Sequence, residues 1–209
     1  MGRDDWFRNT SWDGDIEAAF FKKLSRARDK AQYLRTQASY LASTHPNVAL
    51  RLLDQYFALG EPFHQTPAHV TRAYAYAALG DIDAAILSYD CALAREKAYP
   101  NSLTSAYLDL PSLIVATQRR EHYDKAMRVL IEHKTRLAFP FERYTWHGLL
   151  AILLQDRGQV LDAKQAAITA LDAANATHSG FHNHPRIGLV ADTTDTFGRA
   201  VMKIAGRLH

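Results

Sequence analysis

The sequence has 209 residues, of which 47% are hydrophobic and 22% are charged, and it contains 10 Gly and 7 Pro. This composition is that of a globular protein, and it excludes a collagen-like, disordered or low-complexity chain. A chain of this length buries ~70% of the surface that its unfolded form exposes, so it needs no disulfides to fold. The formal net charge of +3 sets 25 basic against 22 acidic residues, a balance that is no signature of nucleic-acid binding.

The single cysteine, Cys91, excludes an intramolecular disulfide and indicates a reducing compartment. Charged residues soon interrupt every apolar run, so no segment is expected to span a membrane. The first residues contain neither an apolar stretch nor a small-residue cleavage site, and we therefore expect no secretory signal. Together these features predict a cytoplasmic protein that does not bind membranes.

Apolar residues recur at intervals of three and four positions, whereas the alternating Val, Ile and Thr runs of strands are weak. Alanine, the strongest helix former, is abundant. Gly, Pro and small polar clusters separate the apolar stretches. The pattern predicts an all-α protein with helices at residues 15–28, 30–42, 46–59, 67–79, 82–98, 103–119, 123–137, 141–157, 160–176 and 194–208.

The helices between residues 30 and 176 follow each other in pairs, and the second helix of each pair carries a small residue at one shared position. These residues are Ala49, Ala85, Ala126 and Ala163, which are separated by 36, 41 and 37 residues. A two-helix unit does not bury its apolar stripe alone, so several units must stack. The period therefore predicts a repeat protein.

The segment 73–100 resembles a tetratricopeptide repeat, because it has small, aromatic and turn residues in the places of that family. They are Ala73, Tyr76, Gly80, Ala85, Tyr89, Ala92 and Pro100. A second match comprises Ala151, Gly158, Ala163 and Ala170. The units at 30–62 and 103–140 match less well, since Thr44 and Glu121 stand where glycine is expected.

The resemblance implies a right-handed α-solenoid of four antiparallel helix pairs over residues 30–176. Residues 1–29 would form an N-terminal arm and capping helix. Residues 177–209 would form a histidine-containing loop and a C-terminal capping helix, so that the whole chain makes one structural domain. The chain is similar to bacterial repeat proteins with such flanks, a resemblance that implies no activity.

In such a superhelix the first helix of each pair lines the concave surface. Counted from Gly80 and Gly158, this lining includes a mostly apolar set that we predict to hold a partner: Leu34, Val70, Tyr74, Val115, Gln118, Ile152 and Gln155. Family members that grip a peptide carboxylate use Lys, Asn and Arg at these places, and here those residues are missing. An apolar helix or extended segment suits the lining better. The alternative is that the flanks of the chain itself fill the groove.

The segment 22–35 carries a basic patch formed by Lys22, Lys23, Arg26, Arg28, Lys30 and Arg35. One interpretation is an electrostatic surface for an acidic partner or nucleic acid. The other is an ordinary solvated helix face. No aromatic platform, helix-turn-helix or zinc-finger pattern accompanies the patch, so nucleic acid is not the expected partner.

Three histidines, His178, His182 and His184, lie within one polar loop. With a fourth ligand such as Asp192 they would suit zinc or nickel. No Cys or acidic ligand stands at a fixed spacing nearby, so ordinary hydrogen bonding in a packed loop is the favoured interpretation. We therefore expect neither a bound metal nor a cofactor.

No signature of an enzyme is present: the sequence contains no HExxH, no glycine-rich phosphate loop and no GxSxG. Our leading hypothesis is a non-enzymatic protein–protein interaction module, a scaffold or regulator that holds a protein or peptide partner in its groove. A metal-dependent regulator or enzyme centred on His178–His184 is the first alternative. The second is a self-assembling structural protein, for example a homodimer.

Overall fold

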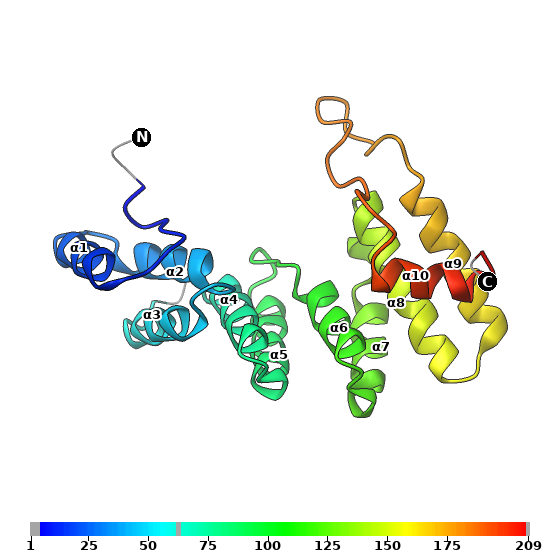
Figure 1. Cartoon of the computed structure of the whole chain (residues 1–209), viewed down its shortest axis with the longest axis horizontal. Helices are drawn as coiled ribbons and strands as arrows, with labels where there is room; N and C mark the ends of the chain where they lie inside the picture. Colours follow the sequence, from blue (N-terminus) through cyan, green and yellow to red (C-terminus); the bar gives the residue numbers. More distant parts are fainter. Residues whose placement is uncertain (1–4, 62–63, 208–209) are drawn as a thin grey trace. The chain divides into compact units, whose positions relative to one another are not determined.

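The structure, a computed structural model, describes residues 5–61 and 64–207 and consists of two compact units, Met1–Ala106 and Tyr107–His209 (Figure 1). Across these described residues it contains ten α-helices, two short 3-10 helices and no strand. The all-α prediction is therefore confirmed. The solenoid arrangement and the predicted division at residues 29 and 176 stay predictions. Residue 208, where we expected the last helix to end, lies outside the described residues.

The first unit contains α1 (Gly14–Ser25), α2 (Lys30–Leu41), α3 (Pro46–Ala58), α4 (Gln65–Ala78) and α5 (Ile82–Ala98). Three of these helices begin after an aspartate, Asp13, Asp29 or Asp81, whose side chain accepts the backbone N–H three residues later. The contacts run in chain order, because α2 packs on α3, α3 on α4 and α4 on α5. Each predicted helix of this unit is present, with ends that differ by a few residues.

An N-terminal arm, residues 5–12, packs into the core of the first unit. The Trp6 and Phe7 rings lie 4.8 and 4.7 Å from the ring of Tyr33 on α2. The side chain of Gln37, which is fully buried, accepts from the Asn9 N–H at 3.0 Å and donates to its carbonyl at 2.7 Å. The arm is thus held by both apolar contacts and a buried polar pair.

The second unit contains α6 (Ala106–Ala116, from Tyr107 onward), α7 (Tyr123–Glu132), α8 (Pro140–Asp156), α9 (Val160–Ala174) and α10 (Thr196–Ile204). The 3-10 helices Arg120–His122 and Lys134–Arg136 flank α7. α8 packs on α7, on α9 and on α10, and α10 also packs on α9. The C-terminal helix therefore covers the last predicted pair.

The turns that follow α4, α6 and α8 close in the same way. Gly80, Gln118 and Gly158 have φ angles of 79°, 53° and 75°, and in each turn the next residue donates its N–H to a carbonyl five residues earlier. This pattern is the Schellman closure, which favours glycine because its central residue is left-handed. The resemblance placed Glu121 where glycine is expected, whereas in the structure Gln118 is the left-handed residue that closes the turn after α6.

None of the helices in the described ranges combines the length and the apolar character that crossing a bilayer requires.

Candidate functional site

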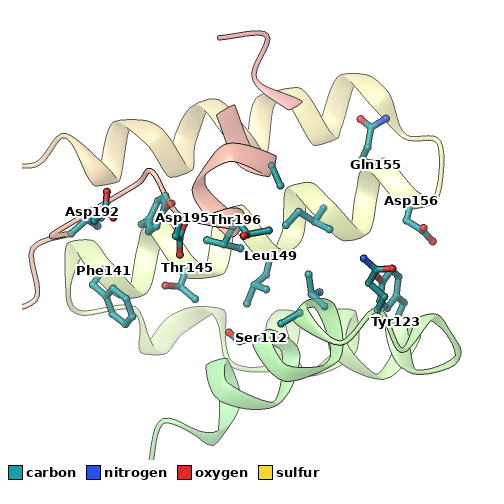
Figure 2. A pocket seen from close by; sticks show the side chains of 18 of the residues that line it. Ser112, Tyr123, Phe141, Thr145, Leu149, Gln155, Asp156, Asp192, Asp195 and Thr196 are labelled. Carbon is teal, nitrogen blue, oxygen red and sulfur yellow. The ribbon is translucent and has the colours of Figure 1, made fainter. Parts of the chain in front are cut away.

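A cavity of about 1340 Å³ lies in the second unit. Its wall is made by α6, the start of α7, one face of α8, residues 189–192 and the first turns of α10 (Figure 2). These elements all belong to Tyr107–His209. The cavity is larger than the roughly 300–1,000 Å³ of pockets that enclose drug-sized ligands.

The floor of the cavity is a stripe along α8. Thr145, Leu149, Ile152 and Gln155 follow each other at intervals of four, three and three residues, and all four line the cavity. Residues at these intervals share one face of a helix. Leu149 is buried, whereas Ile152 and the facing Val115 of α6 are half-buried. The middle of the cavity is therefore apolar and open to a ligand.

The wall opposite α6 is an irregular segment, residues 189–192, which the preceding loop fixes to the start of α8. The Phe141 N–H donates to the Gly188 carbonyl at 2.7 Å. Gly188 has a φ of 65°, and a Cβ there would lie 2.6 Å from the Cβ of Phe139. Phe139 in turn stacks on Phe181 at 5.2 Å. A side chain at position 188 would push the segment away from α8.

α10 begins at the edge of the cavity with a tight cap. Asp195 accepts the Gly198 N–H at 2.7 Å, and a Cβ on Gly198 would lie 1.9 Å from the Thr193 carbonyl oxygen. The Phe197 ring packs so closely on α8 that a Cβ on Gly148 would lie 2.5 Å from it. Two glycines therefore determine where α10 starts and how near it lies to the cavity floor.

Charged side chains lie at both ends of the cavity. Figure 2 shows Asp192 and Asp195 with Thr145 at one end and Asp156 at the other. Asp156 pairs with Arg120, with 3.3 Å between Oδ1 and Nε. Among the described residues, no Lys, Arg or His forms an ion pair with Asp192 or Asp195. One end of the cavity is thus neutral and the other carries two uncompensated carboxylates.

The side chain of Tyr144 lies beside the acidic end. It is only 4% exposed, its ring contacts Phe197 edge-on at 5.5 Å, and it contributes to the cavity lining. Its buried hydroxyl has no hydrogen-bond partner within the described residues. Burial raises the pKa of the phenol to about 12, and the nearby carboxylates of Asp195 and Asp192 act in the same direction. The hydroxyl is therefore protonated at neutral pH and able to donate or accept.

Asp192 is held in place by its neighbour. The Thr194 N–H and hydroxyl both donate to Oδ1 of Asp192 at 2.8 Å. These hydrogen bonds hold the pKa of the Asp192 carboxyl below its usual range. The Asp192 carboxyl is therefore ionised at neutral pH. Its negative charge lies at the same end of the cavity as Asp195.

The structure brings together the four predicted groove residues that lie in the second unit: Val115, Gln118, Ile152 and Gln155. The other three lie in the first unit. Leu34 and Val70 are buried, with exposures of 3% and 7%, so neither presents a surface to a partner. Tyr74 is exposed and lies edge-on to Tyr89 at 6.2 Å.

The basic patch lies on α1, α2 and the turn between them. Five of its members are exposed and Arg35 is half-buried; the exposed ones are Lys22, Lys23, Arg26, Arg28 and Lys30. The Lys23 ammonium lies 5.9 Å from the Trp6 ring. Neither interpretation of the patch is decided by these contacts, so both stay predictions.

The three histidines of the loop do not converge. His178 accepts the Gly180 N–H at 2.9 Å, and the His182 ring lies 3.1 Å from the Asn183 side-chain oxygen. Within residues 5–61 and 64–207, no three His, Cys, Asp or Glu side chains form a group that would hold a metal ion. The His178 and His182 side chains instead form hydrogen bonds within the loop.

Sequence reasoning missed Tyr144 and Asp195, and it considered Asp192 only as a metal ligand. The acidic end depends on an irregular segment, in which no periodicity predicts which side chains turn inward. The available signal was Asp195 itself, because an aspartate before a helix is a cap and thus fixes the helix start. We had placed this start at residue 194.

No family model matches this chain, and neither a curated protein nor a solved structure matches it. The likeness to tetratricopeptide repeats therefore depends on the residues that carry it, and the function must follow from the chemistry of the cavity.

Proposed function

We propose that the protein is a non-enzymatic interaction module, a scaffold or regulator that holds an apolar segment of a partner protein in the cavity of its second unit. The observation that carries this proposal is the open apolar stripe along α8, with Leu149 and Ile152 facing Val115. Contacts between α2 and α3, α4 and α5, and α8 and α9 support the interpretation as repeated helix pairs, which build such binding surfaces in solenoids.

The size of the cavity favours a peptide over a small metabolite. At about 1340 Å³ it exceeds the pockets that enclose most small ligands. Its polar groups stand at the two ends, with Gln118 and Gln155 near the Arg120–Asp156 pair and Asp192 and Asp195 at the other. An elongated ligand with an apolar middle matches this order of groups.

Apolar burial would supply most of the affinity. Removing one Leu, Ile or Phe side chain from water contributes about 1.5–3 kcal/mol. Two such side chains placed over Ile152 and Leu149 contribute about 3–6 kcal/mol, whereas a dissociation constant of about 1 μM corresponds to about 8 kcal/mol, so further contacts along the segment must supply the remainder. Because the floor of the cavity is a packed helix, α8, the protein needs little reorganisation to bind the segment.

The test is a selection of random displayed peptides on the purified protein, followed by affinity measurements with four synthetic winners. We expect peptides with two apolar anchors, and we expect Ile152→Arg to weaken them at least about tenfold because it places a charge among apolar side chains. Leu161→Arg is the matched control, since Leu161 is 85% exposed and does not line the cavity.

The control should leave the affinity unchanged. Peptides that bind the wild type and Ile152→Arg equally well would show that the cavity is not the binding site. A selection that yields only peptides without apolar anchors would contradict the proposed apolar recognition.

A further inference from the structure

The N-terminal arm occupies a site on the first unit that holds a non-helical segment. The Trp6 ring lies 5.4 Å from Phe20 of α1 and 4.8 Å from Tyr33 of α2, so the arm contacts both helices. Phe7 is 8% exposed and lies 4.7 Å from the same Tyr33 ring. Two adjacent aromatic side chains therefore fill the apolar part of this site.

The polar part of the site is Gln37 of α2, whose side chain is fully buried. Its Oε1 accepts the main-chain N–H of Asn9 at 3.0 Å and the side-chain amide of Asn9 at 2.9 Å. Its Nε2 donates to the carbonyl of the same residue at 2.7 Å. One buried amide thus uses both its acceptor and its donor on a single residue of the segment. We call Phe20, Tyr33 and Gln37 the arm site.

The basic patch lies beside the arm site, because the Lys23 ammonium is 5.9 Å from the Trp6 ring. Its five exposed members form no ion pair within residues 5–61 and 64–207; they are Lys22, Lys23, Arg26, Arg28 and Lys30. Asp5 of the arm does not neutralise them, since it pairs with Arg8 of the arm at 3.1 Å. The arm therefore fills the arm site and leaves the adjacent positive charge unpaired.

The arm is joined to α1 by a link that lets it leave. Trp12 is held independently, since its Nε1 donates to Oε2 of Glu17 on α1 at 2.7 Å. Thr10 and Ser11, which precede Trp12, are both exposed. Residues 5–9 can therefore dissociate from the arm site while Trp12 keeps its contact with α1.

We infer that the arm site is a second binding site, which takes an acidic aromatic segment of a partner protein in place of the arm. Such a segment reproduces the aromatic and main-chain contacts of the arm. Carboxylates next to its aromatic pair in addition face the cations of the patch, which the arm leaves unpaired. Attraction between exposed charges is strongest at low salt. The inference concerns the first unit and is independent of the cavity in the second.

The attached arm makes the site selective. A segment on a short flexible link competes at an effective concentration in the millimolar range. A partner segment that offers only aromatic and main-chain contacts gains nothing over the arm and is excluded by it. A segment that also carries carboxylates has an additional interaction, so it displaces the arm at a lower concentration.

The test uses three fluorescent peptides and the full-length protein at low salt. The first peptide has the sequence of residues 5–12, the second has four glutamates in front of that sequence, and the third is the second with Phe7→Ala. Fluorescence anisotropy measures their affinities. We expect the second peptide to bind at least tenfold more tightly than the first. The third should lose at least tenfold, because its carboxylates remain but its buried ring is gone.

Displacement of the arm is measured separately by amide hydrogen exchange. Exchange of residues 5–9 of the protein should speed up when the acidic peptide binds, whereas exchange of α5 should not change. Phe7→Ala in the protein should tighten the acidic peptide at least tenfold, because it weakens the attached competitor. Exchange of α5 in this variant reports whether the first unit remains folded.

Charge removal locates the preference for the acidic peptide. The triple change Lys22→Gln, Lys23→Gln and Arg26→Gln should bring the acidic peptide to within threefold of the plain arm peptide. Lys164→Gln, at an exposed lysine of α9 in the second unit, is the control and should retain the full preference.

Equal affinities of the acidic and the plain peptide would overturn the role of the patch, as would a preference that survives the triple change. Binding of the acidic peptide without faster exchange of residues 5–9 would place it outside the arm site. A single-stranded oligothymidine that binds more tightly than the acidic peptide would assign the patch to nucleic acid. If no peptide binds either the wild type or the Phe7→Ala protein, the arm is a permanent part of the core and the inference fails, while the cavity of the second unit is unaffected.

Discussion

The two units of the molecule are both built from helices that pack on one another, but they differ in whether a helix surface is covered or open. In the first unit the N-terminal arm joins the core, so that Leu34 lies in one apolar cluster with Phe7 and Phe20. In the second unit the corresponding residues of α6 and α8, Val115 and Ile152, remain on the wall of an open cavity. Helices that follow each other in antiparallel pairs thus enclose a core in one unit and leave an open cavity in the other.

The two units differ in the segments that flank their helices. The arm of the first unit places aromatic rings directly on α2, and Gln37 secures it with a buried amide. The C-terminal flank of the second unit packs on α8 through the contact of Phe197 with Tyr144. Its residues Asp192 and Asp195 instead line the cavity. Whether a helix surface is covered or open therefore depends in both units on residues outside residues 30–176.

The largest effect expected from this comparison is on the free energy of unfolding, when one phenylalanine of each unit is replaced by alanine. Phe20 is 1% exposed and its ring contacts Trp6, Trp12 and Phe21. Phe20→Ala should therefore lower the free energy of unfolding by about 3–5 kcal/mol. Phe141 lines the open cavity and is half exposed, so Phe141→Ala should change stability by less than about 1 kcal/mol.

Urea unfolding of both variants measures this contrast. Equal losses would mean that the cavity wall is as tightly packed as the core of the first unit, which would contradict the comparison. Phe141→Ala should in addition weaken peptide binding, whereas Phe20→Ala should not alter the cavity.

A smaller effect is expected at the contact that secures the arm. Gln37→Ala removes the partners of the Asn9 N–H and carbonyl, which then remain without hydrogen bonds. The cost should be about 1–3 kcal/mol. Amide hydrogen exchange of residues 5–12 should speed up more than that of α5, because the arm detaches first. Gln32→Ala, at an exposed site on the same helix, is the control.

If exchange in the arm and in α5 rises equally, Gln37 supports the whole unit and has no special role in holding the arm. If neither changes, the aromatic contacts of Trp6 and Phe7 alone keep the arm in place.

Local sequence signals predicted the helices well, because the signals themselves are local. Asp29, Asp81 and Pro46 stand where helices begin, and Gly80 and Gly158 stand where they end. Capping and turn chemistry involves only a few neighbouring residues, so a single sequence reveals it.

The cavity was predicted only in part, since its walls depend on contacts between distant segments. Helical spacing placed Ile152 and Gln155 on one face of α8, and both residues line the cavity. Leu34 shares its core cluster with Phe7 of the arm, and the acidic end of the cavity belongs to an irregular segment. Neither pairing leaves a periodic trace in the sequence, so no count of intervals predicts it.

The smallest expected effect concerns Gln118, where the two units differ at one turn. Gly80 closes the turn after α4, whereas Gln118 closes the turn after α6 in the same left-handed conformation, with a φ of 53°. That conformation costs a residue with a side chain roughly 1–2 kcal/mol, part of which glycine loses again through its greater freedom in the unfolded chain. Gln118→Gly should therefore stabilise the protein by about 0.5–1 kcal/mol in urea unfolding, and Gly158→Gln should destabilise it by a similar amount.

Gln118 lines the cavity, and strained residues persist where their side chains serve a site. The same Gln118→Gly variant should bind the selected peptides more weakly than the wild type does. A variant that gains stability and keeps its full peptide affinity would show that the strain at this turn has no part in binding.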